Sequence, residues 1–242
     1  MLPIKDDQPR YSRPYVNGFL IGLNIVIFLF QWFQMMTDPH GADRFAKTFG
    51  EVPAHLAAFL AGSPKYTLPA VVVPFFTSMF LHGSWMHVIG NMWFLWMFGN
   101  QVERILGRWV FCLVYLGCGL GGDLLHYLFN STSAIPSVGA SGAISGIAGC
   151  FFVLFPKANF DLVFYFRFWT LKTIHTHTAV AVGAWIAEQA LLGVLSLKFQ
   201  AFSVAFWAHV GGFAVGLVAG GIALILMPRK KKLLRGEAQP AD

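Results

Sequence analysis

The chain has 242 residues, of which 56% are hydrophobic and only 12% are charged. Soluble globular domains carry about 25% charged residues, so this chain has too few charges to cover a surface that faces water. The 25 phenylalanines and 8 tryptophans exclude a disordered chain, because such a sequence would collapse around its aromatic side chains. The composition therefore indicates a polytopic membrane protein.

The net charge of +6 comes from 17 Lys and Arg against 11 Asp and Glu. In a membrane protein such cations typically lie in loops at the membrane surface. We therefore expect the lipid bilayer, and no nucleic acid, as a partner. The three cysteines, Cys112, Cys118 and Cys150, lie inside apolar runs. An odd set of this kind predicts neither a disulfide framework nor a metal site, and we expect no cofactor.

Three polar segments divide the chain. We expect a cytoplasmic tail over 1–17, a long mixed connection over about 37–80 and a basic cytoplasmic tail over 228–242. The apolar stretch Leu68–Phe76 is too short to cross a bilayer, and we expect it at the interface. The rest predicts an all-α domain, 18–227, with six spans at about 18–36, 84–102, 109–129, 139–156, 174–196 and 202–227.

The Lys and Arg residues are distributed unevenly between the two sides of this topology. The side that holds both termini and the loops 100–108 and 157–172 carries 13 of them, and the other side carries 4. The positive-inside rule therefore places both termini in the cytoplasm. Residues 160–171 are rich in aromatic side chains, as expected where a chain meets the membrane surface.

Polar side chains inside the spans are the candidates for function, because they are costly in hydrocarbon. The fourth span opens with Gly139-Ala140-Ser141-Gly142. Small residues there favour close helix packing, which is one explanation. The other is that Ser141 is an open nucleophile beside the free backbone N–H groups of a helix start, which would stabilise an oxyanion.

A serine nucleophile needs a base, and the sixth span offers one. His209 lies on the same helical stripe as Gly212, Gly216 and Gly220, a row of small residues typical of tight helix packing. If this face packs on the fourth span, His209 meets Ser141, because both residues lie near the outer ends of their helices. A lone histidine is also a common structural hydrogen bonder, so both interpretations stay open at this point.

His87 and Asn91 share one face of the second span, since they are four residues apart. An imidazole N–H and an amide NH₂ are donors suited to a developing negative oxygen. The second span also begins on the outer side, so these donors lie at the depth predicted for Ser141.

The combination of H-x-x-x-N in the second span, G-x-S-G in the fourth and A-H-x-x-G-x-x-x-G in the sixth resembles the rhomboid family of intramembrane serine proteases. The resemblance covers about 18–227. It implies a six-helix bundle in which Ser141 is the nucleophile and His209 the general base. It also implies an oxyanion hole from His87, Asn91 and backbone N–H, with supporting roles for His82, Glu103, Gly139, Gly142, Gly212 and Gly216.

The resemblance also implies what the protein acts on and where. The expected substrates are transmembrane segments of other membrane proteins, cleaved near their outer ends, at a site facing the extracytoplasmic side of a bacterial inner membrane. The Trp-Arg pair that many family members carry in the first loop does not occur within 37–80, which leaves the conformation of that loop open. The sequence specifies no oligomeric state.

Other intramembrane residues receive no catalytic role from the motifs. Asp123 and His126 form an i, i+3 pair that satisfies itself locally, and Glu188 is expected to be structural; His175 and His177 are expected near the cytoplasmic surface. The sequence lacks the H-E-x-x-H helix of a metalloprotease. The alternative to a protease is a non-catalytic protein, either a transporter or a protein that binds transmembrane helices.

Overall fold

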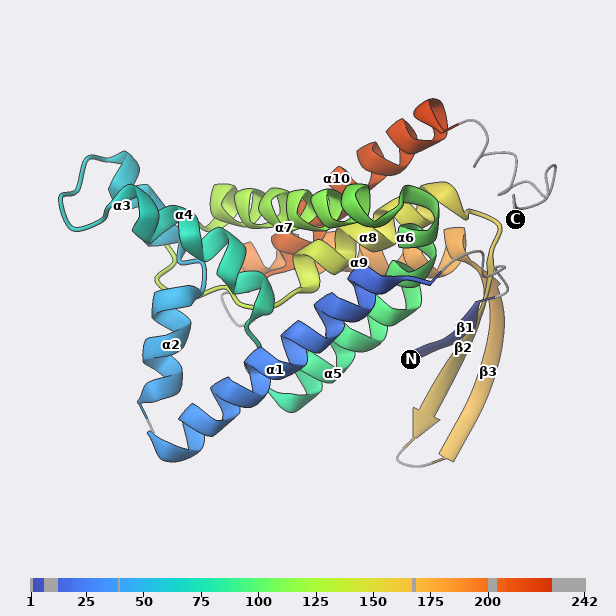
Figure 1. Ribbon diagram of the computed structural model, residues 1–242, viewed down its shortest axis with the longest axis horizontal. Helices are drawn as coiled ribbons and strands as arrows, with labels where there is room; N and C mark the ends of the chain where they lie inside the picture. Colours follow the sequence, from blue (N-terminus) through green and yellow to red (C-terminus); the bar gives the residue numbers. More distant parts are fainter. Residues whose placement is uncertain (1, 7–12, 39, 167–168, 200–203, 228–242) are drawn as a thin grey trace.

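The structure is a computed structural model that describes residues 2–6, 13–38, 40–166, 169–199 and 204–227. It is mainly helical, with a small sheet beside one end of the helices (Figure 1). The predicted basic tail, 228–242, lies outside the described residues. The long helices are α1 (Tyr15–Thr37), α7 (Arg108–Asn130), α9 (Thr178–Phe199) and α10 (Phe206–Leu226).

Each of the six apolar runs contains a helix, but not every helix is long enough to cross a membrane. Within the described residues, α1, α7, α9 and α10 meet the length and hydropathy expected of a span. A fifth candidate joins 68–80 to 85–106 through a bend of 80°. The fourth run forms α8 (Ser141–Leu154), which has only 14 residues. The structure thus supports a polytopic protein with four or five candidate spans.

Helix α8 lies in the centre of the bundle, flanked by α7 and α10 (Figure 1). It is buried along most of its length. The approach of α10 is close because small residues face each other: a Cβ added to Gly212 would overlap the carbonyl oxygen of Gly142, and one added to Gly216 would overlap that of Gly146. The predicted small face of the sixth run is therefore a helix-packing surface.

The second apolar run is one helical column with a local π turn. It comprises α5 (Trp85–Phe94), the π turn η2 (Leu95–Gly99) and α6 (Asn100–Leu106). A side chain of α1 pairs with this turn, since the Asn17 amide donates to the carbonyl of Leu95 at 3.0 Å and to the side-chain oxygen of Asn100 at 2.9 Å. π turns leave backbone groups free, and Asn17 pairs with one of them.

Glu103 on α6 caps a different helix. Its carboxylate accepts hydrogen bonds from the backbone N–H groups of Val16 (3.0 Å) and Asn17 (2.6 Å) at the start of α1. The first N–H groups of a helix have no partner within it, and α1 has no side-chain cap of its own. Glu103 is buried and ties the beginning of α1 to the end of the second column.

The first connection is more ordered than the sequence indicated. It folds into α2 (Gly41–Phe49), α3 (Pro53–Leu60), α4 (Leu68–Thr77) and the 3₁₀ turn η1 (Ser78–Phe80). Glu51 exchanges two backbone hydrogen bonds with Ser137, of 3.0 and 2.6 Å. The Glu51 carboxyl is buried, and this burial, with the nearby charge of Asp123, raises the pKa of Glu51 to about 8.

A three-stranded antiparallel sheet was not predicted. Strand β1 (Leu2–Asp6) pairs with β2 (Asn159–Phe166), which pairs with β3 (Trp169–His177). The sequence predicted a polar tail at 1–17 and an aromatic interfacial loop at 157–172. Aromatic and β-branched residues also favour strands, so the aromatic segment 160–171, predicted at the membrane surface, and the predicted start of the fifth span at about 174 fall within β2 and β3.

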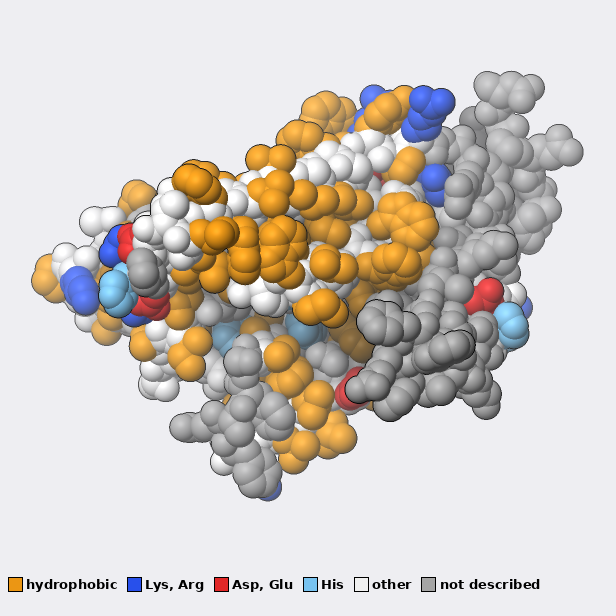
Figure 2. All heavy atoms as spheres, turned by 90° about the horizontal axis from the view of Figure 1, so that it is seen from below, with side chains coloured by type: hydrophobic (Ala, Val, Ile, Leu, Met, Phe, Trp, Pro, Cys, Tyr) orange, Lys and Arg blue, Asp and Glu red, His pale blue; other side chains and the backbone are white. Residues whose placement is uncertain are grey.

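The outer surface supports a lipid environment. Hydrophobic side chains cover most of the described helical surface on the face seen in Figure 2, and most of the charged side chains visible there lie toward its edges. Large apolar residues of the long helices are exposed along their lengths, including Phe19, Leu113 and Ile225. A water-soluble protein rarely exposes so large an apolar area.

Candidate active site

Three helices begin close together at the candidate site, and each supplies one of the predicted residues. Ser141 is the first residue of α8, His209 lies in the first turn of α10, and His87 lies in the first turn of α5. The chain enters α8 through Gly139, whose φ of +133° favours glycine. The Gly139 N–H donates to the carbonyl of Ser78 at 2.9 Å, which fixes this turn against the first connection.

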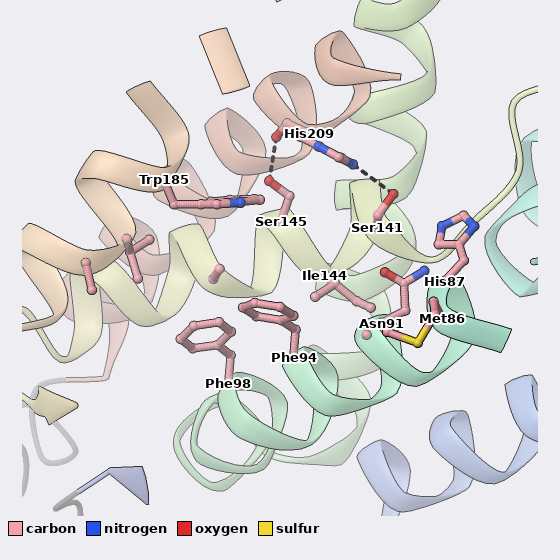
Figure 3. Close-up of a pocket in the computed structure, with 14 residues that line it drawn as sticks. Met86, His87, Asn91, Phe94, Phe98, Ser141, Ile144, Ser145, Trp185 and His209 are labelled. Carbon is pink, nitrogen blue, oxygen red and sulfur yellow. Dashed lines mark hydrogen bonds between the residues drawn. The ribbon is translucent and has the colours of Figure 1, made fainter. Parts of the chain in front are cut away.

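The structure places Ser141 and His209 side by side. The Ser141 hydroxyl lies 2.9 Å from Nε2 of His209 (Figure 3). The two residues are 68 positions apart in the chain and meet because the glycine faces of α8 and α10 let these helices approach closely. An imidazole nitrogen at this distance can accept the hydroxyl proton.

His87 and Asn91 lie on the opposite side of Ser141, on α5 (Figure 3). A Cβ added to Gly139 would come within 2.8 Å of the His87 ring and 3.6 Å of the Asn91 amide nitrogen, so only glycine leaves room there. The Asn91 Nδ2 atom is buried and has no hydrogen-bond partner among the described residues. An unpaired buried donor beside a serine is suited to receive an oxyanion.

Ser145 lies one turn after Ser141 and has a different partner. Its hydroxyl donates to the backbone carbonyl of His209 at 2.6 Å (Figure 3). The two serines of α8 thus both contact His209, Ser141 through the ring and Ser145 through the main chain. The Ser141 hydroxyl therefore faces the imidazole, whereas the Ser145 hydroxyl faces the main chain.

The other ring nitrogen of His209 has a partner to which the sequence motifs assigned no role. Nδ1 lies 2.7 Å from Oε1 of Gln189 on α9. Trp185, one turn earlier on the same helix, lies against the His209 ring with centroids 6.0 Å apart and an interplanar angle of 31°. The signal available in the sequence was a glutamine in the middle of an apolar span, one turn from a tryptophan.

A pocket of about 330 Å³ opens between α5, α8 and α9, and His209 and Trp185 are among the residues that line it. Ser141, His209, His87 and Asn91 line one end, and the remaining lining is mostly apolar, with Phe94, Phe98, Ile144, Val182 and Trp185. Figure 3 shows both phenylalanines facing α8 across this space. Among the described residues, no group of three or more His, Cys, Asp or Glu side chains is arranged to hold a metal ion.

The predicted supporting residues make different kinds of contact. His82 is buried behind His87, with ring centroids 5.0 Å apart, and its backbone N–H donates to the Gln31 side chain. Glu103 is far from the pocket and caps α1, as described above. Gly142, Gly212 and Gly216 form the contact between α8 and α10.

The other polar residues singled out in the sequence do not line the pocket. Asp123 accepts a hydrogen bond from the Ser78 hydroxyl at 3.2 Å. The predicted Asp123–His126 pair is not among the described hydrogen bonds, since the His126 ring lies against the Asn130 amide instead, at 3.3 Å. Glu188 is exposed on α9. Of the two histidines near the start of α9, His175 pairs with Asp161 across β2 and β3 at 2.5 Å, and His177 is also exposed.

A family model described as the Rhomboid domain matches residues 69–226. The chain belongs to the rhomboid family. It is 32% identical over 151 residues to Rhomboid protein 1, mitochondrial, of Saccharomyces cerevisiae, covering 59% of this chain and 39% of the yeast protein.

Two further rhomboid relatives are similar over a comparable share of the chain. Rhomboid-like protein 11, chloroplastic, of Arabidopsis thaliana is 41% identical over 149 residues, covering 60% of this chain and 50% of that protein. The human Presenilin-associated rhomboid-like protein, mitochondrial, is 33% identical over 162 residues, covering 65% of this chain and 40% of the human protein. The matched parts are half or less of each relative's length.

These relatives correct one prediction. The sequence led us to expect a bacterial inner membrane, whereas the named relatives are mitochondrial or chloroplast proteins of eukaryotes. A bacterial inner membrane is therefore not supported. The counting of basic residues concerns which side of a membrane a loop occupies, and it carries no information about which membrane that is.

Proposed function

We propose that this rhomboid protein is an intramembrane serine endopeptidase that cleaves transmembrane segments of other membrane proteins. Ser141 is the nucleophile and His209 the general base. The observation that carries the proposal is the 2.9 Å separation of the Ser141 hydroxyl and His209 Nε2 at the end of an apolar pocket. Serine needs such a base to attack a carbonyl at neutral pH.

The positions of the side chains support the following reaction. Ser141 Oγ bonds to the carbonyl carbon of the scissile peptide as its proton passes to His209 Nε2. The carbonyl oxygen becomes negative, and it is held by the Asn91 amide, the His87 ring and the Ser141 backbone N–H. His209 then gives its proton to the leaving amine, which leaves an acyl-enzyme, and water activated by His209 releases the acid.

We also propose that all six helical columns cross the membrane within one domain, 18–227, with both termini in the cytoplasm. Helix α8 is only about 21 Å long at 1.5 Å per residue, against a hydrocarbon thickness of about 30 Å. It is enclosed by other helices, so its ends need not reach the membrane surfaces. Its first residue, Ser141, would then lie below the outer surface of the membrane. Water would reach Ser141 from the outer side.

The pocket favours an extended substrate segment. The carbonyl groups of an intact helix are paired within the helix, so a transmembrane substrate must unwind near its outer end before Ser141 reaches a carbonyl. The apolar wall formed by Phe94, Phe98 and Trp185 would contact the apolar side chains of such a segment. These contacts with the pocket would replace part of the contacts with lipid that the substrate segment loses when it leaves the bilayer.

The test is cleavage of a transmembrane reporter by the purified protein in liposomes. Ser141→Ala is expected to abolish cleavage, whereas Ser145→Ala, which removes the neighbouring hydroxyl and its hydrogen bond to the His209 carbonyl, is expected to slow cleavage without abolishing it. Cleavage that survives in Ser141→Ala would contradict the proposal. Reporter binding without cleavage by the unaltered protein would instead favour a non-catalytic protein that binds transmembrane helices.

A further inference from the structure

The proposed reaction uses only one of the two ring nitrogens of His209. The other, Nδ1, lies 2.7 Å from the side-chain oxygen of Gln189. Gln189 is 7% exposed and sits midway along α9, an apolar helix. A buried amide in such a helix is costly unless it is hydrogen-bonded, and the His209 ring supplies a hydrogen-bond partner for its oxygen.

The Gln189 contact determines where the imidazole carries its proton. A neutral imidazole has one N–H, on either Nδ1 or Nε2. A carbonyl oxygen can only accept a hydrogen bond, so its position beside Nδ1 favours the proton on Nδ1. The lone pair of Nε2 then faces the Ser141 hydroxyl, which is the arrangement that a general base requires.

The same helix restrains the plane of the ring. Trp185 lies one turn before Gln189, and its indole is tilted by 31° from the His209 ring at a centroid distance of 6.0 Å. Ser145 holds the His209 backbone carbonyl from α8. The ring is thus restrained at its Nδ1 edge and on its face by α9, and its main chain is restrained by α8.

From this geometry we infer that Gln189 is a positioning residue for His209, the third member of a Ser141–His209–Gln189 chain of hydrogen bonds. The inference rests on the proposed protease function. Gln189 touches no reacting atom and acts through the tautomer and orientation of His209. As the ring becomes positively charged in the transition state, the hydrogen bond to the Gln189 oxygen strengthens.

The experiment compares three variants on the same transmembrane reporter. Gln189→Leu keeps the size and removes the acceptor, and it is expected to lower kcat roughly 10- to 100-fold, the range for losing a hydrogen bond to a group that becomes charged. KM is expected to stay unchanged, because the interaction strengthens in the transition state. Gln189→Glu keeps an acceptor oxygen and is expected to restore most of the activity lost in the leucine variant.

The matched control is Glu188→Leu, which removes the adjacent polar side chain from the exposed side of α9 and is expected to leave kcat unchanged. A spectroscopic readout accompanies the kinetics: ¹⁵N NMR of His209 in micelles is expected to show the proton on Nδ1 in the unaltered protein. The Nε2–H form is expected to grow in Gln189→Leu.

Two sets of results would overturn the inference, and they are distinguishable. Unchanged kcat and unchanged tautomer in Gln189→Leu, or a Gln189→Glu variant no more active than Gln189→Leu, would overturn the positioning role alone. Reporter cleavage that persists in Ser141→Ala would overturn the proposed function, and with it any role for Gln189 in that reaction.

Discussion

At the residue scale, the polar side chains buried among the helices fall into two groups. Asn17 and Glu103 pair with backbone atoms of a neighbouring helix and join parts of the fold. Asn91 presents a buried amide nitrogen, unpaired among the described residues, beside Ser141. A buried polar group without a hydrogen-bond partner is costly. The Asn91 amide beside Ser141 is therefore suited to bind a ligand or transition state that accepts a hydrogen bond from it.

Glu51 gives a prediction about the pH dependence of stability. Its pKa of about 8 in the folded protein lies above the ordinary value of 4.5, so the folded state keeps a proton that the unfolded chain releases. The free energy of unfolding therefore falls as pH rises between these two values. One pKa unit corresponds to about 1.4 kcal/mol, so the loss is on the order of several kcal/mol.

The measurement is thermal unfolding in detergent micelles at about pH 5 and about pH 9, near the two ends of this window. Glu51→Gln, which carries no titrating proton, is expected to remove most of the difference and to be the more stable protein at the higher pH. An equally steep pH dependence in Glu51→Gln would show that another group is responsible.

The sequence was sufficient to predict which residues meet at the site but not how each is held. The spacing of the small residues along the sixth run and the matched depth of Ser141 and His209 made their contact a conditional prediction, and the resemblance to the rhomboid family made it the expected one; the structure places the two side chains in contact. The partner of His209 Nδ1 could not be predicted, because it depends on how α9 is rotated about its axis, and α9 has no strongly polar face to indicate this.

At the scale of the elements, the contact between α8 and α10 holds the site together. Both helices approach through glycine, so a single methyl group is enough to separate them. Elsewhere the sequence was less informative. Its aromatic segment predicts a chain at the membrane surface, whereas strands β2 and β3 form there, and its pattern does not predict helices α2 and α3 of the first connection. Short elements are set by tertiary contacts more than by local pattern.

Two glycines of α10 provide a matched test of this contact. Gly216→Ala is expected to cost about 2 kcal/mol or more in the free energy of unfolding, because its Cβ would overlap the Gly146 carbonyl oxygen. Gly221→Ala meets nothing within 4 Å and is expected to be neutral or stabilising by up to about 1 kcal/mol.

The readouts for these two variants are the unfolding midpoint and reporter cleavage. We expect both to fall in Gly216→Ala and neither to fall in Gly221→Ala, because moving α10 also moves His209 away from Ser141. Equal stability and activity of the two variants would contradict the close packing of α8 and α10.

At the scale of the whole molecule, the helix bundle combines an apolar outer surface with polar side chains at one end of an internal pocket. The long helices expose apolar side chains (Figure 2), while the short α8 is enclosed and begins with Ser141. A bundle of this kind suits the proposed hydrolysis at membrane depth, since the outer helices would meet the lipid and the central helix need not. The proposed reaction requires Ser141 to be an activated nucleophile.

The most direct measurement of that claim is reaction of the purified protein with a fluorophosphonate, followed by mass spectrometry to locate the adduct. We expect one covalent adduct, on Ser141, with labelling lost in both Ser141→Ala and His209→Ala and retained, at a lower rate, in Ser145→Ala. An unreactive Ser141 in the folded, unaltered protein, or labelling that persists at full rate without His209, would contradict it.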